Sequence, residues 1–486
     1  MVGHVGRLQL LPMKAGESTT AAEQSTRESG LRYVVESLIS LALAVMLVRS
    51  FAVEGYIIST GSMAPYLLGY HKQVVCPNCR CPFAVGVPVE TEYATSGPVA
   101  CPNCQQDQID LGKVPRNEGD QLLVQKFAYL LRHPRRWEVV VFQNPSHPTQ
   151  AYVKRAIGLP NESLQIVGGD IWINGELVRK DLDEQRSTRI PFETQRHFSQ
   201  SDKASRWHND TGWQMRSNGL ELPKESESWA WVKYQRERVP DHSSSTTTAV
   251  AWPTDEYGYN GLTDPTQTHR VRDLMLSAEV ELHTGRGDFA ISLTDGLQVF
   301  EARLAAGQRE LQLFLDGQKT PAAKTDLDGS VWRRPIRLEL STFDRQLLFA
   351  VDGETIFVQK LPPRANQVGD PGLAANDGTP VRFGARDLHV SVRDLTLFRD
   401  VYYTRGDARH GVTEPCQLGP DEYFFLGDNS PVSLDSRSWP EAVVHRNSLI
   451  GKPFMVHLPS RPGRIKLGSA EWHIRVPDWG RIRYIR

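Results

Sequence analysis

The sequence of 486 residues has little imbalance of charge, since 56 lysines and arginines face 57 aspartates and glutamates for a formal net charge of -1. Without an excess of basic residues the chain has no global positive field, which argues against nucleic acid as a partner. Nothing in the composition indicates disorder of the whole chain. The length exceeds one ordinary domain and suggests about three.

Cysteine is also scarce, with six residues in the chain. Five of the six fall between residues 76 and 104, and Cys416 stands alone. This distribution excludes a disulfide framework for the whole protein and indicates one local site.

One long apolar run lies near the N-terminus, at residues 33–53. Its length suits a helix that crosses a bilayer, and its two charges, Glu36 and Arg49, lie near the ends. We therefore predict a transmembrane anchor at residues 31–53 after a disordered polar tail, residues 1–30. A cleaved signal peptide or a buried helix is the alternative, because the uncharged centre is short. Basic residues before the run predict a cytoplasmic N-terminus.

Four of the clustered cysteines form two C-P-N-C knuckles within residues 71–112: Cys76 with Cys79, and Cys101 with Cys104. Paired knuckles at this spacing are typical of a zinc ribbon, in which four thiolates hold one structural ion. Two disulfides are the alternative if the module lies in an oxidising compartment. Cys81 would be a spare thiol.

A loop with a candidate nucleophile follows the apolar run, in the stretch G-Y-I-I-S-T-G-S-M-A-P-Y-L at residues 55–67. Gly61 allows a sharp turn beside Ser62, and Pro65 prevents a regular helix. Clusters of this composition are usually only loops, so the serine needs a partner elsewhere in the chain.

Residues 113–180 predict a series of strands. The strand A-Y-V-K-R-A-I-G-L-P, which begins at Ala151, carries Lys154 among apolar residues, with Arg155 on the opposite face. A lysine on the inward face of a strand is costly unless it loses its proton or finds a partner, although many such lysines reach solvent. Asn174-Gly175 predicts a tight hairpin.

Residues 181–399 differ in character and predict a β-sandwich. Short alternating strands end in Asp316-Gly317 and Asp352-Gly353, the pattern of antiparallel hairpins. The strand rhythm resembles the concanavalin-like (laminin-G-like) jelly rolls. The tryptophans in the first part of this segment form either a glycan-stacking face or part of the core.

The last part, residues 400–486, contains an apolar strand that leads into a polar loop. Ser433, Asp435 and Arg437 place a hydroxyl, a carboxylate and a bidentate donor within five residues. That is more hydrogen-bonding capacity than a turn requires. The moderately basic C-terminal tail predicts either contact with an anionic membrane surface or a solvated face.

Three blocks together resemble the signature blocks of type I signal peptidases, the serine-lysine endopeptidases that remove signal peptides. They are T-G-S-M-x-P from Thr60, V-K-R-A-I-G-L-P from Val153 and G-D-N-S-x-x-S-x-D-S-R from Gly427. The resemblance covers residues 31–70, 113–180 and 400–460. It implies a mainly β fold: an N-terminal transmembrane helix and an antiparallel β core, interrupted by the zinc ribbon and a jelly-roll-like β-sandwich.

The same resemblance assigns roles to residues. Ser62 matches the nucleophile, Lys154 the general base, and Thr60 the residue whose hydroxyl helps to form the oxyanion hole. Ser433 matches the residue that orients the lysine, supported by the ion pair of Asp435 and Arg437. The block departs from the commoner G-D-N-R-x-x-S pattern at its fourth and fifth positions, which hold a serine and a proline.

The chemistry agrees with these roles. A serine needs a base to take its proton, and none of the blocks contains a histidine placed to do so. A lysine serves if burial lowers its pKa. No cofactor is expected for catalysis, and structural zinc is expected at Cys76, Cys79, Cys101 and Cys104.

We therefore predict a membrane-bound peptidase with its catalytic domain outside the cytoplasm. The resemblance implies cleavage after small residues at the first and third positions before the cut. Its partners are preprotein signal peptides and the lipid bilayer, with the secretion translocon as a further candidate. A membrane-tethered glycan- or protein-binding protein with an inactive peptidase core is the alternative. A self-cleaving repressor is disfavoured because the chain has no DNA-binding signature.

Overall fold

The computed structural model describes most of the chain in two compact units, residues 1–54 and 55–486. The described residues run from 19 to 485, with gaps at 48–51, 89–98, 104–105, 108, 113, 146, 195–205, 210–211, 217–218, 224–225, 238–249, 262–267, 330, 364–378 and 468–469. Strands dominate these residues, so the prediction of a mainly β fold is confirmed.

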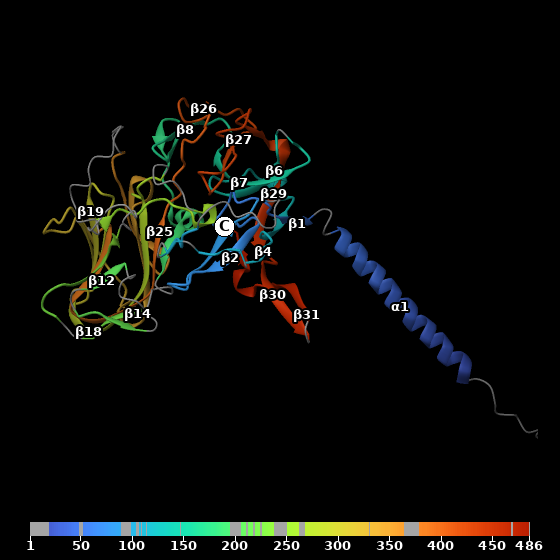
Figure 1. The fold of residues 1–486 in the computed structure, drawn as a ribbon, viewed down its shortest axis with the longest axis horizontal. Helices are drawn as coiled ribbons and strands as arrows, with labels where there is room; N and C mark the ends of the chain where they lie inside the picture. Colours follow the sequence, from blue (N-terminus) through green and yellow to red (C-terminus); the bar gives the residue numbers. More distant parts are fainter. Residues whose placement is uncertain are drawn as a thin grey trace, which may run out of the picture. The chain divides into compact units, whose positions relative to one another are not determined.

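The first unit contains helix α1, Thr19–Leu47 (Figure 1). Its start corrects the prediction of a disordered tail through residue 30, because helix extends into that polar segment. Residues 31–53 were predicted to form a transmembrane helix. Among the described residues, no helix is both long enough and apolar enough to cross a membrane. The apolar run fills only part of α1, and Glu36, near its start, pairs with Arg32 at 2.7 Å.

An eight-stranded sheet forms the centre of the second unit. Its strands are β1 (Val53–Ile57), β5 (Gln121–Gln125), β29 (Leu449–Val456), β6 (Val139–Gln143), β7 (Ala151–Gly158), β27 (Glu422–Leu426) and β28 (Val444–His445) in spatial order, with β32 (Arg483–Tyr484) beside β29. Cyan-to-teal and red segments therefore pair in Figure 1, since β29 lies antiparallel to both β5 and β6.

The strand positions follow from sequence pattern. β5 alternates buried and partly buried residues because only one of its faces meets the core, whereas the first four residues of the Val-rich β6 are all buried in the sheet interior. Within the predicted series of strands, the residues just after β5 form a short helix, α2 (Ala128–Leu131). Alternation ends at Gln125, so the apolar residues beyond it did not specify a strand.

Two small sheets flank this centre. The cysteine module contains β3 (Pro82–Gly86), β2 (His71–Val75) and β4 (Arg116–Asn117). A four-stranded sheet contains β10 (Glu176–Leu177), β9 (Asp170–Ile173), β8 (Ser163–Val167) and β26 (Cys416–Gln417). β9 and β10 pair across Asn174-Gly175, so the predicted hairpin is confirmed.

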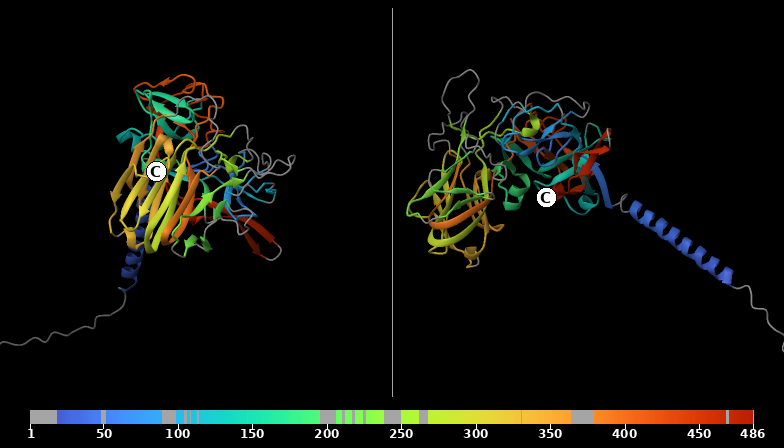
Figure 2. Two further views of the ribbon diagram at one scale, coloured as in Figure 1. Left: turned by 90° about the vertical axis from the view of Figure 1, so that its left-hand side faces the viewer. Right: turned by 60° about the horizontal axis from the view of Figure 1, so that its bottom comes forward.

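The predicted sandwich segment, residues 181–399, is built on two long strands, β18 (Leu274–Thr294) and β25 (Val381–Arg399) (Figures 1 and 2). They pair along almost their whole length, with bulges where the register shifts. On one side lie β19 (Val299–Ala305), β20 (Glu310–Leu315) and β21 (Ala323–Asp326), and β18 also pairs with β22 (Ile336–Ser341).

The remaining elements of this segment are short. They are α3 (Leu182–Thr188), β11 (Ile190–Thr194), β12 (Trp207–Asn209), β13 (Gln214–Arg216), β14 (Gly219–Leu222), β15 (Ala230–Tyr234), β16 (Arg236–Glu237), β17 (Val250–Ala251), η4 (Gly258–Asn260), η6 (Val331–Arg333), η7 (Phe343–Arg345), β23 (Gln346–Val351) and β24 (Glu354–Lys360). The C-terminal tail forms the hairpin β30 (Ser460–Leu467) and β31 (Ala470–Pro477). Near the C-terminus, η8 (Arg446–Ser448) and η9 (Trp479–Arg481) are single turns.

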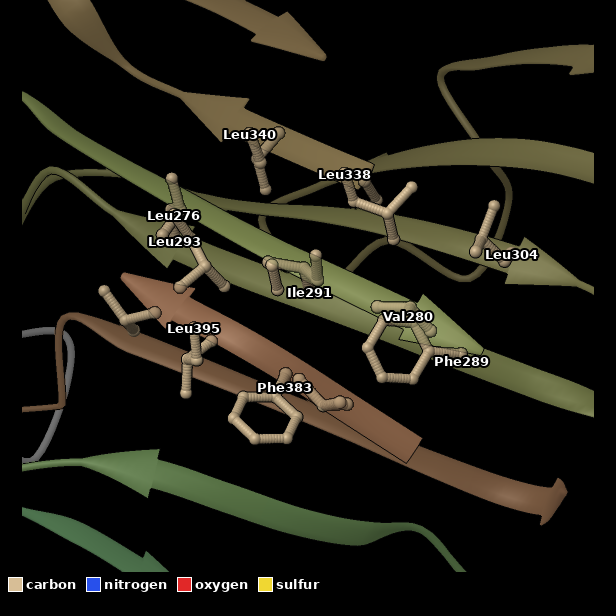
Figure 3. Close-up of a cluster of buried hydrophobic side chains, with 14 of the residues drawn as sticks. Leu276, Val280, Phe289, Ile291, Leu293, Leu304, Leu338, Leu340, Phe383 and Leu395 are labelled. Carbon is tan, nitrogen blue, oxygen red and sulfur yellow. The ribbon is translucent and has the colours of Figure 1, made fainter. Parts of the chain in front are cut away.

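The long strands enclose one large apolar core. Figure 3 shows side chains of β18, β19, β22 and β25 gathered in a single cluster, including Phe289, Ile291, Leu340 and Phe383. The residues on either side of Ile291 and Leu340 are buried as well, so both faces of these strands are covered there. The hairpins at Asp316-Gly317 and Asp352-Gly353 are confirmed.

The tryptophans of this segment have two different environments. Trp207 and Trp213 are buried in the core, at 5% and 4% exposure. Trp229 and Trp231 are partly exposed and stack with ring centroids 4.8 Å apart. The prediction that these tryptophans belong to the core is thus correct for Trp207 and Trp213, whereas Trp229 and Trp231 lie on the outer face.

An ion cluster connects the two ends of the predicted insertion. Lys180 Nζ lies 2.7 Å from Asp400 Oδ2 and 2.7 Å from Asp344 Oδ1. Lys180 and Asp400 are the residues that directly flank residues 181–399, so the chain leaves and re-enters the core at one buried point. Hydrogen bonds at this point hold the insertion to the rest of the unit.

Candidate active site

The serine loop, residues 58–70, brings Ser62 to a half-buried position, with Thr60 exposed and Met63 buried. The loop closes through backbone hydrogen bonds from Ala64 N to Gly61 O, 3.0 Å, and from Leu67 N to Met63 O, 2.8 Å. Gly61 is required for close packing, because a side chain there would overlap the Tyr259 ring. Gly61 was expected to allow a sharp turn, and in the structure it also leaves room for the Tyr259 ring.

Lys154 lies in β7 and is only 3% exposed. Its Nζ is 5.7 Å from the centre of the Tyr152 ring. Burial lowers the pKa of Lys154 to about 8, against an opposing effect of the Asp435 carboxylate, which favours the charged form. Ala156 of the same strand and Met63 of the serine loop are buried, which agrees with the apolar setting that a neutral lysine needs.

Two polar groups at the site lack partners. Among the described residues, Lys154 Nζ forms no hydrogen bond or ion pair within normal distance, and none joins it to Ser62 Oγ. Ser433 Oγ is buried without a hydrogen-bond partner. Buried polar atoms without partners are rare and often occur at functional sites, where the partner arrives with the substrate or on a small rearrangement.

The acidic loop, residues 427–437, is organised by an ion pair. Asp435 is fully buried and accepts from Arg437 Nε at 2.9 Å and from Arg437 Nη2 at 2.8 Å. Gly427 N also donates to Asp435 Oδ2, at 3.1 Å. Arg437 Nη1 donates to Ser430 Oγ at 2.8 Å, so the departure from the commoner block gives the arginine an additional acceptor. The carboxylate raises the pKa of Arg437 despite its burial.

Gly427 brings the serine loop and the acidic loop together. A side chain at this position would overlap Ser433 Oγ and Ser62 O, so only glycine fits. Gly427 follows Leu426, which pairs with Arg155 across the sheet. Three of the predicted blocks, those of Ser62, Lys154 and Ser433, therefore converge around one glycine.

Sequence reasoning missed a second buried ion pair. Arg155 is on the opposite face from Lys154 as predicted, but it is fully buried and makes a bidentate pair with Asp428, at 2.8 and 2.6 Å. Its guanidinium also donates to Ser187 O at 3.0 Å. Arg155 and Asp428 carry opposite charges and lie within two of the recognised blocks, which is a signal that could have suggested this pair.

The cysteine module brings three of its predicted ligands together. The sulfur atoms of Cys76, Cys79 and Cys101 all lie within 4.8 Å of one another, and the three side chains are buried. Cys79 Sγ and Cys101 Sγ are 3.6 Å apart. Cys104 lies outside the described residues. Cys81 is beside this group. Its interaction with Cys101 lowers its pKa, but the interaction with Cys79 and burial outweigh that effect and raise the pKa to about 12.

The family "Signal peptidase, peptidase S26" matches residues 115–226 and 367–458, together less than half of the chain. Lys154 falls in the first matched segment, and Ser433, Asp435 and Arg437 fall in the second. Ser62 precedes both. The unmatched interval lies within the predicted insertion, residues 181–399.

Relatives with the same description are similar over short stretches. Signal peptidase I of Leptolyngbya laminosa is 43% identical over 70 residues, which cover 13% of this chain and 34% of the relative. Signal peptidase I V of Bacillus subtilis (strain 168) is 36% identical over 61 residues, covering 13% and 35%. This chain thus spans about a third of the length of the curated relatives it matches. These matches support a hydrolase of the signal peptidase type.

Solved structures resemble the chain only remotely. The carbohydrate-binding module CBM66 from Bacillus subtilis has 12% identity and a TM-score of 0.24, covering 40% of this chain and 94% of its own. The exoplasmic/lumenal domain of VIP36 has 12% identity and a TM-score of 0.25, covering 40% and 84%. At these TM-scores neither comparison contributes to the argument.

Proposed function

We propose that this protein is a serine endopeptidase that removes signal peptides from exported preproteins by a Ser62–Lys154 dyad. The observation that carries the proposal is the convergence of Ser62, Gly427 and Ser433 at the end of β27, whose partner strand β7 carries the buried Lys154. The family match and the named relatives support it.

In this mechanism the neutral amine of Lys154 takes the proton of Ser62 Oγ as Oγ attacks the scissile carbonyl. The substrate and a small rotation of the side chains bring the three groups within reach, and Ser433 Oγ accepts a hydrogen bond from Lys154 Nζ. The Ser62 N–H and the Thr60 hydroxyl donate to the oxyanion, a contribution of roughly 3 kcal/mol per donor in comparable sites.

Collapse of the tetrahedral intermediate releases the mature protein with its new amino terminus and leaves the signal peptide as an ester on Ser62. Lys154 gives its proton to the leaving amine, and is then neutral again. It activates a water that hydrolyses the ester and regenerates the serine. We propose that the substrate is bound as an extended strand with small side chains at the first and third positions before the cut.

The test uses a fluorogenic peptide with an Ala-X-Ala cleavage site and a preprotein that carries its signal peptide. Ser62→Ala and Lys154→Ala are expected to abolish cleavage while the far-ultraviolet spectrum and melting temperature stay near those of the wild type. Wild-type cleavage by either variant would refute the proposal.

We also propose that the cysteine module binds one zinc ion through Cys76, Cys79, Cys101 and Cys104. A tetrahedral site with Zn–S bonds of about 2.3 Å requires sulfur atoms roughly 3.8 Å apart. The 3.6 Å between Cys79 and Cys101 sulfurs fits that requirement. Metal analysis of the purified protein should find one zinc per chain, and disulfides on mass mapping without bound metal would exclude the site.

For the location, we propose the cell membrane with the N-terminus in the cytoplasm and the catalytic unit on the outer face. Several apolar side chains of α1 are exposed, among them Leu38, Ile39 and Leu41 at 59%, 55% and 61%. Exposed apolar surface of this kind favours a lipid environment. Extraction of membranes at alkaline pH, followed by protease protection, tests the location, and recovery in the soluble fraction would contradict it.

Binding of a glycan through the insertion is the second candidate function. The partly exposed stack of Trp229 on Trp231 favours it, because a sugar ring packs well on such a surface. Arg303, Arg382 and Arg386 lie over these two rings and would add hydrogen-bond donors. A glycan array tests it, and an inactive peptidase with glycan binding would favour this function over proteolysis.

A further inference from the structure

The turn η4 belongs to the predicted insertion, yet its contacts lie in the candidate active site. Together with the preceding Tyr257 it forms the sequence Tyr-Gly-Tyr-Asn at residues 257–260, here called the insertion turn. Tyr257 and Tyr259 are buried, in clusters that also contain Leu426 and Ala64 respectively. A segment well inside the insertion is therefore packed against both functional loops.

The side chain of Asn260 makes a reciprocal amide pair with Asn429. Asn260 Nδ2 donates to Asn429 Oδ1 at 2.8 Å, and Asn429 Nδ2 donates to Asn260 Oδ1 at 2.7 Å. Asn429 is fully buried, so its amide depends on protein partners. Its orientation is consequently fixed by the insertion turn.

Asn429 in turn holds the backbone on both sides of Ser62. Its Nδ2 donates to Gly61 O at 2.9 Å, and its backbone N donates to Ser62 O at 3.0 Å. Gly61 O and Ser62 N belong to the same planar peptide group, in which the C=O and N–H point in opposite directions. The hydrogen bond that fixes the Gly61 carbonyl therefore also fixes the direction of the Ser62 N–H.

The two tyrosines keep the turn in place. Tyr257 Oη donates to Asp428 O at 2.9 Å, and Tyr259 Oη donates to Tyr70 O at 2.9 Å. The Tyr259 ring fills the space that the absence of a side chain leaves at Gly61. Both ends of the turn are thus attached to the loops that carry the proposed catalytic groups.

We propose that Asn260 is a positioning residue for the oxyanion hole: through Asn429 it aims the Ser62 N–H at the developing oxyanion. This inference rests on the proposed function, and adds that the sandwich insertion is part of the catalytic machinery. An insertion that only bound a partner would not need to hold the peptide group of the nucleophile.

Asn260→Ala tests the role, with kcat and KM measured on the fluorogenic Ala-X-Ala peptide. Without its partner the Asn429 amide is free to rotate away from Gly61 O, so kcat should fall about 10- to 100-fold, as is typical when an aligned group moves. KM and the pH midpoint of kcat should stay unchanged, because substrate contacts and the burial of Lys154 are unaffected. Gln298→Ala, which removes an amide from an exposed hairpin of the same insertion, is the matched control and should behave as the wild type.

A double-mutant cycle separates positioning from general destabilisation. Asn260→Ala should cause little further loss of kcat in an Asn429→Ala background, since the two amides act through one hydrogen bond to Gly61 O. Additive losses, or wild-type kcat in Asn260→Ala, would overturn the proposal. If Asn260→Ala does not fold, Tyr257→Phe removes only the hydrogen bond to Asp428 O and should lower kcat with unchanged KM; wild-type kcat there overturns it equally.

Ser62→Ala distinguishes failure of the proposed function from failure of the positioning role. Cleavage by Ser62→Ala at the wild-type rate refutes the proposed function, and the positioning role with it. Loss of cleavage in Ser62→Ala together with unchanged kcat in Asn260→Ala refutes the positioning role alone.

Discussion

Two buried lysines in this protein have opposite electrostatic environments. Lys154 and Lys180 are 3% and 2% exposed, so both have lost their contact with water. Burial lowers the pKa of Lys154 to about 8, whereas the carboxylates of Asp344 and Asp400 outweigh burial and raise the pKa of Lys180. Lys154 forms no ion pair among the described residues, while Lys180 has two.

The difference shows that burial alone does not decide what a lysine does. A buried lysine with close anionic partners stays charged and serves as a structural cation. A buried lysine without such partners has a lowered pKa, so its neutral form is easier to reach and can accept a proton. The two lysines also lie in different places. Lys180 joins the ends of the insertion, and Lys154 lies beside the serine and acidic loops.

Exchange of each lysine for methionine should give the largest contrast in activity. Lys154→Met keeps the volume but removes the base, so kcat should fall by about 10²- to 10⁴-fold. Lys180→Met should retain most of the activity per folded molecule, because Lys180 takes no part in the chemistry. Cleavage of the Ala-X-Ala peptide, normalised to the folded fraction, measures both. Equal losses in the two variants would remove the functional distinction.

Stability should show the reverse order. Lys180→Met leaves two buried carboxylates without their cation, and the free energy of unfolding should fall by roughly 3–5 kcal/mol. Urea denaturation at pH 7 measures it. Lys324→Met is the matched control: its 3.2 Å pair with Glu310 is on the surface, and its loss should change stability by less than about 1 kcal/mol.

Lys154→Met should instead stabilise the protein at pH 7, by up to about 3 kcal/mol, since the pKa of Lys154 falls from 10.5 to about 8 on folding. Below pH 8 both the folded and the unfolded chain hold the proton, so the wild type bears the full cost of a buried charge. Between pH 8 and 10.5 the unfolded chain binds more protons, and wild-type stability should rise with pH. Urea titrations at pH 7 and pH 10 should show that this rise is absent in Lys154→Met.

The pH dependence of the wild-type rate sharpens the same comparison. The fraction of neutral Lys154 increases about tenfold per pH unit below its pKa, so kcat should rise with pH and level off above about pH 8. Initial rates at saturating peptide between pH 5 and 10 measure it. A profile controlled by a group that titrates near pH 4 would contradict a lysine base.

Local pattern predicted much of the fold. Runs of β-branched and alternating residues are found in the strands β6 and β7. Three hairpins were predicted from their turn residues, which such turns require: Asn174-Gly175, Asp316-Gly317 and Asp352-Gly353. The position of α1 was less well predicted. Its helix begins at Thr19, in polar residues that precede the apolar run on which the prediction was based.

The spacing of the cysteines predicted a local cluster, and three of the four expected ligands do lie together. The blocks around Ser62, Lys154 and Ser433 were recognisable because each contains residue types that a plain loop or strand does not need. In the structure, the blocks of Ser62 and Ser433 meet at Gly427, as expected if they form one site.

The sequence by itself determined the kinds of residue available for chemistry. The three blocks contain a serine, a lysine and a loop rich in hydroxyl and carboxylate side chains, and none of them contains a histidine placed to act as the base. Only the tertiary structure decided which lysine is left without an anion, since Asp344 and Asp400 reach Lys180 from positions 164 and 220 residues away. It also placed Asn260 against Asn429, 169 residues further along the chain. Such contacts follow from the packing of whole sheets and leave no local pattern in the sequence.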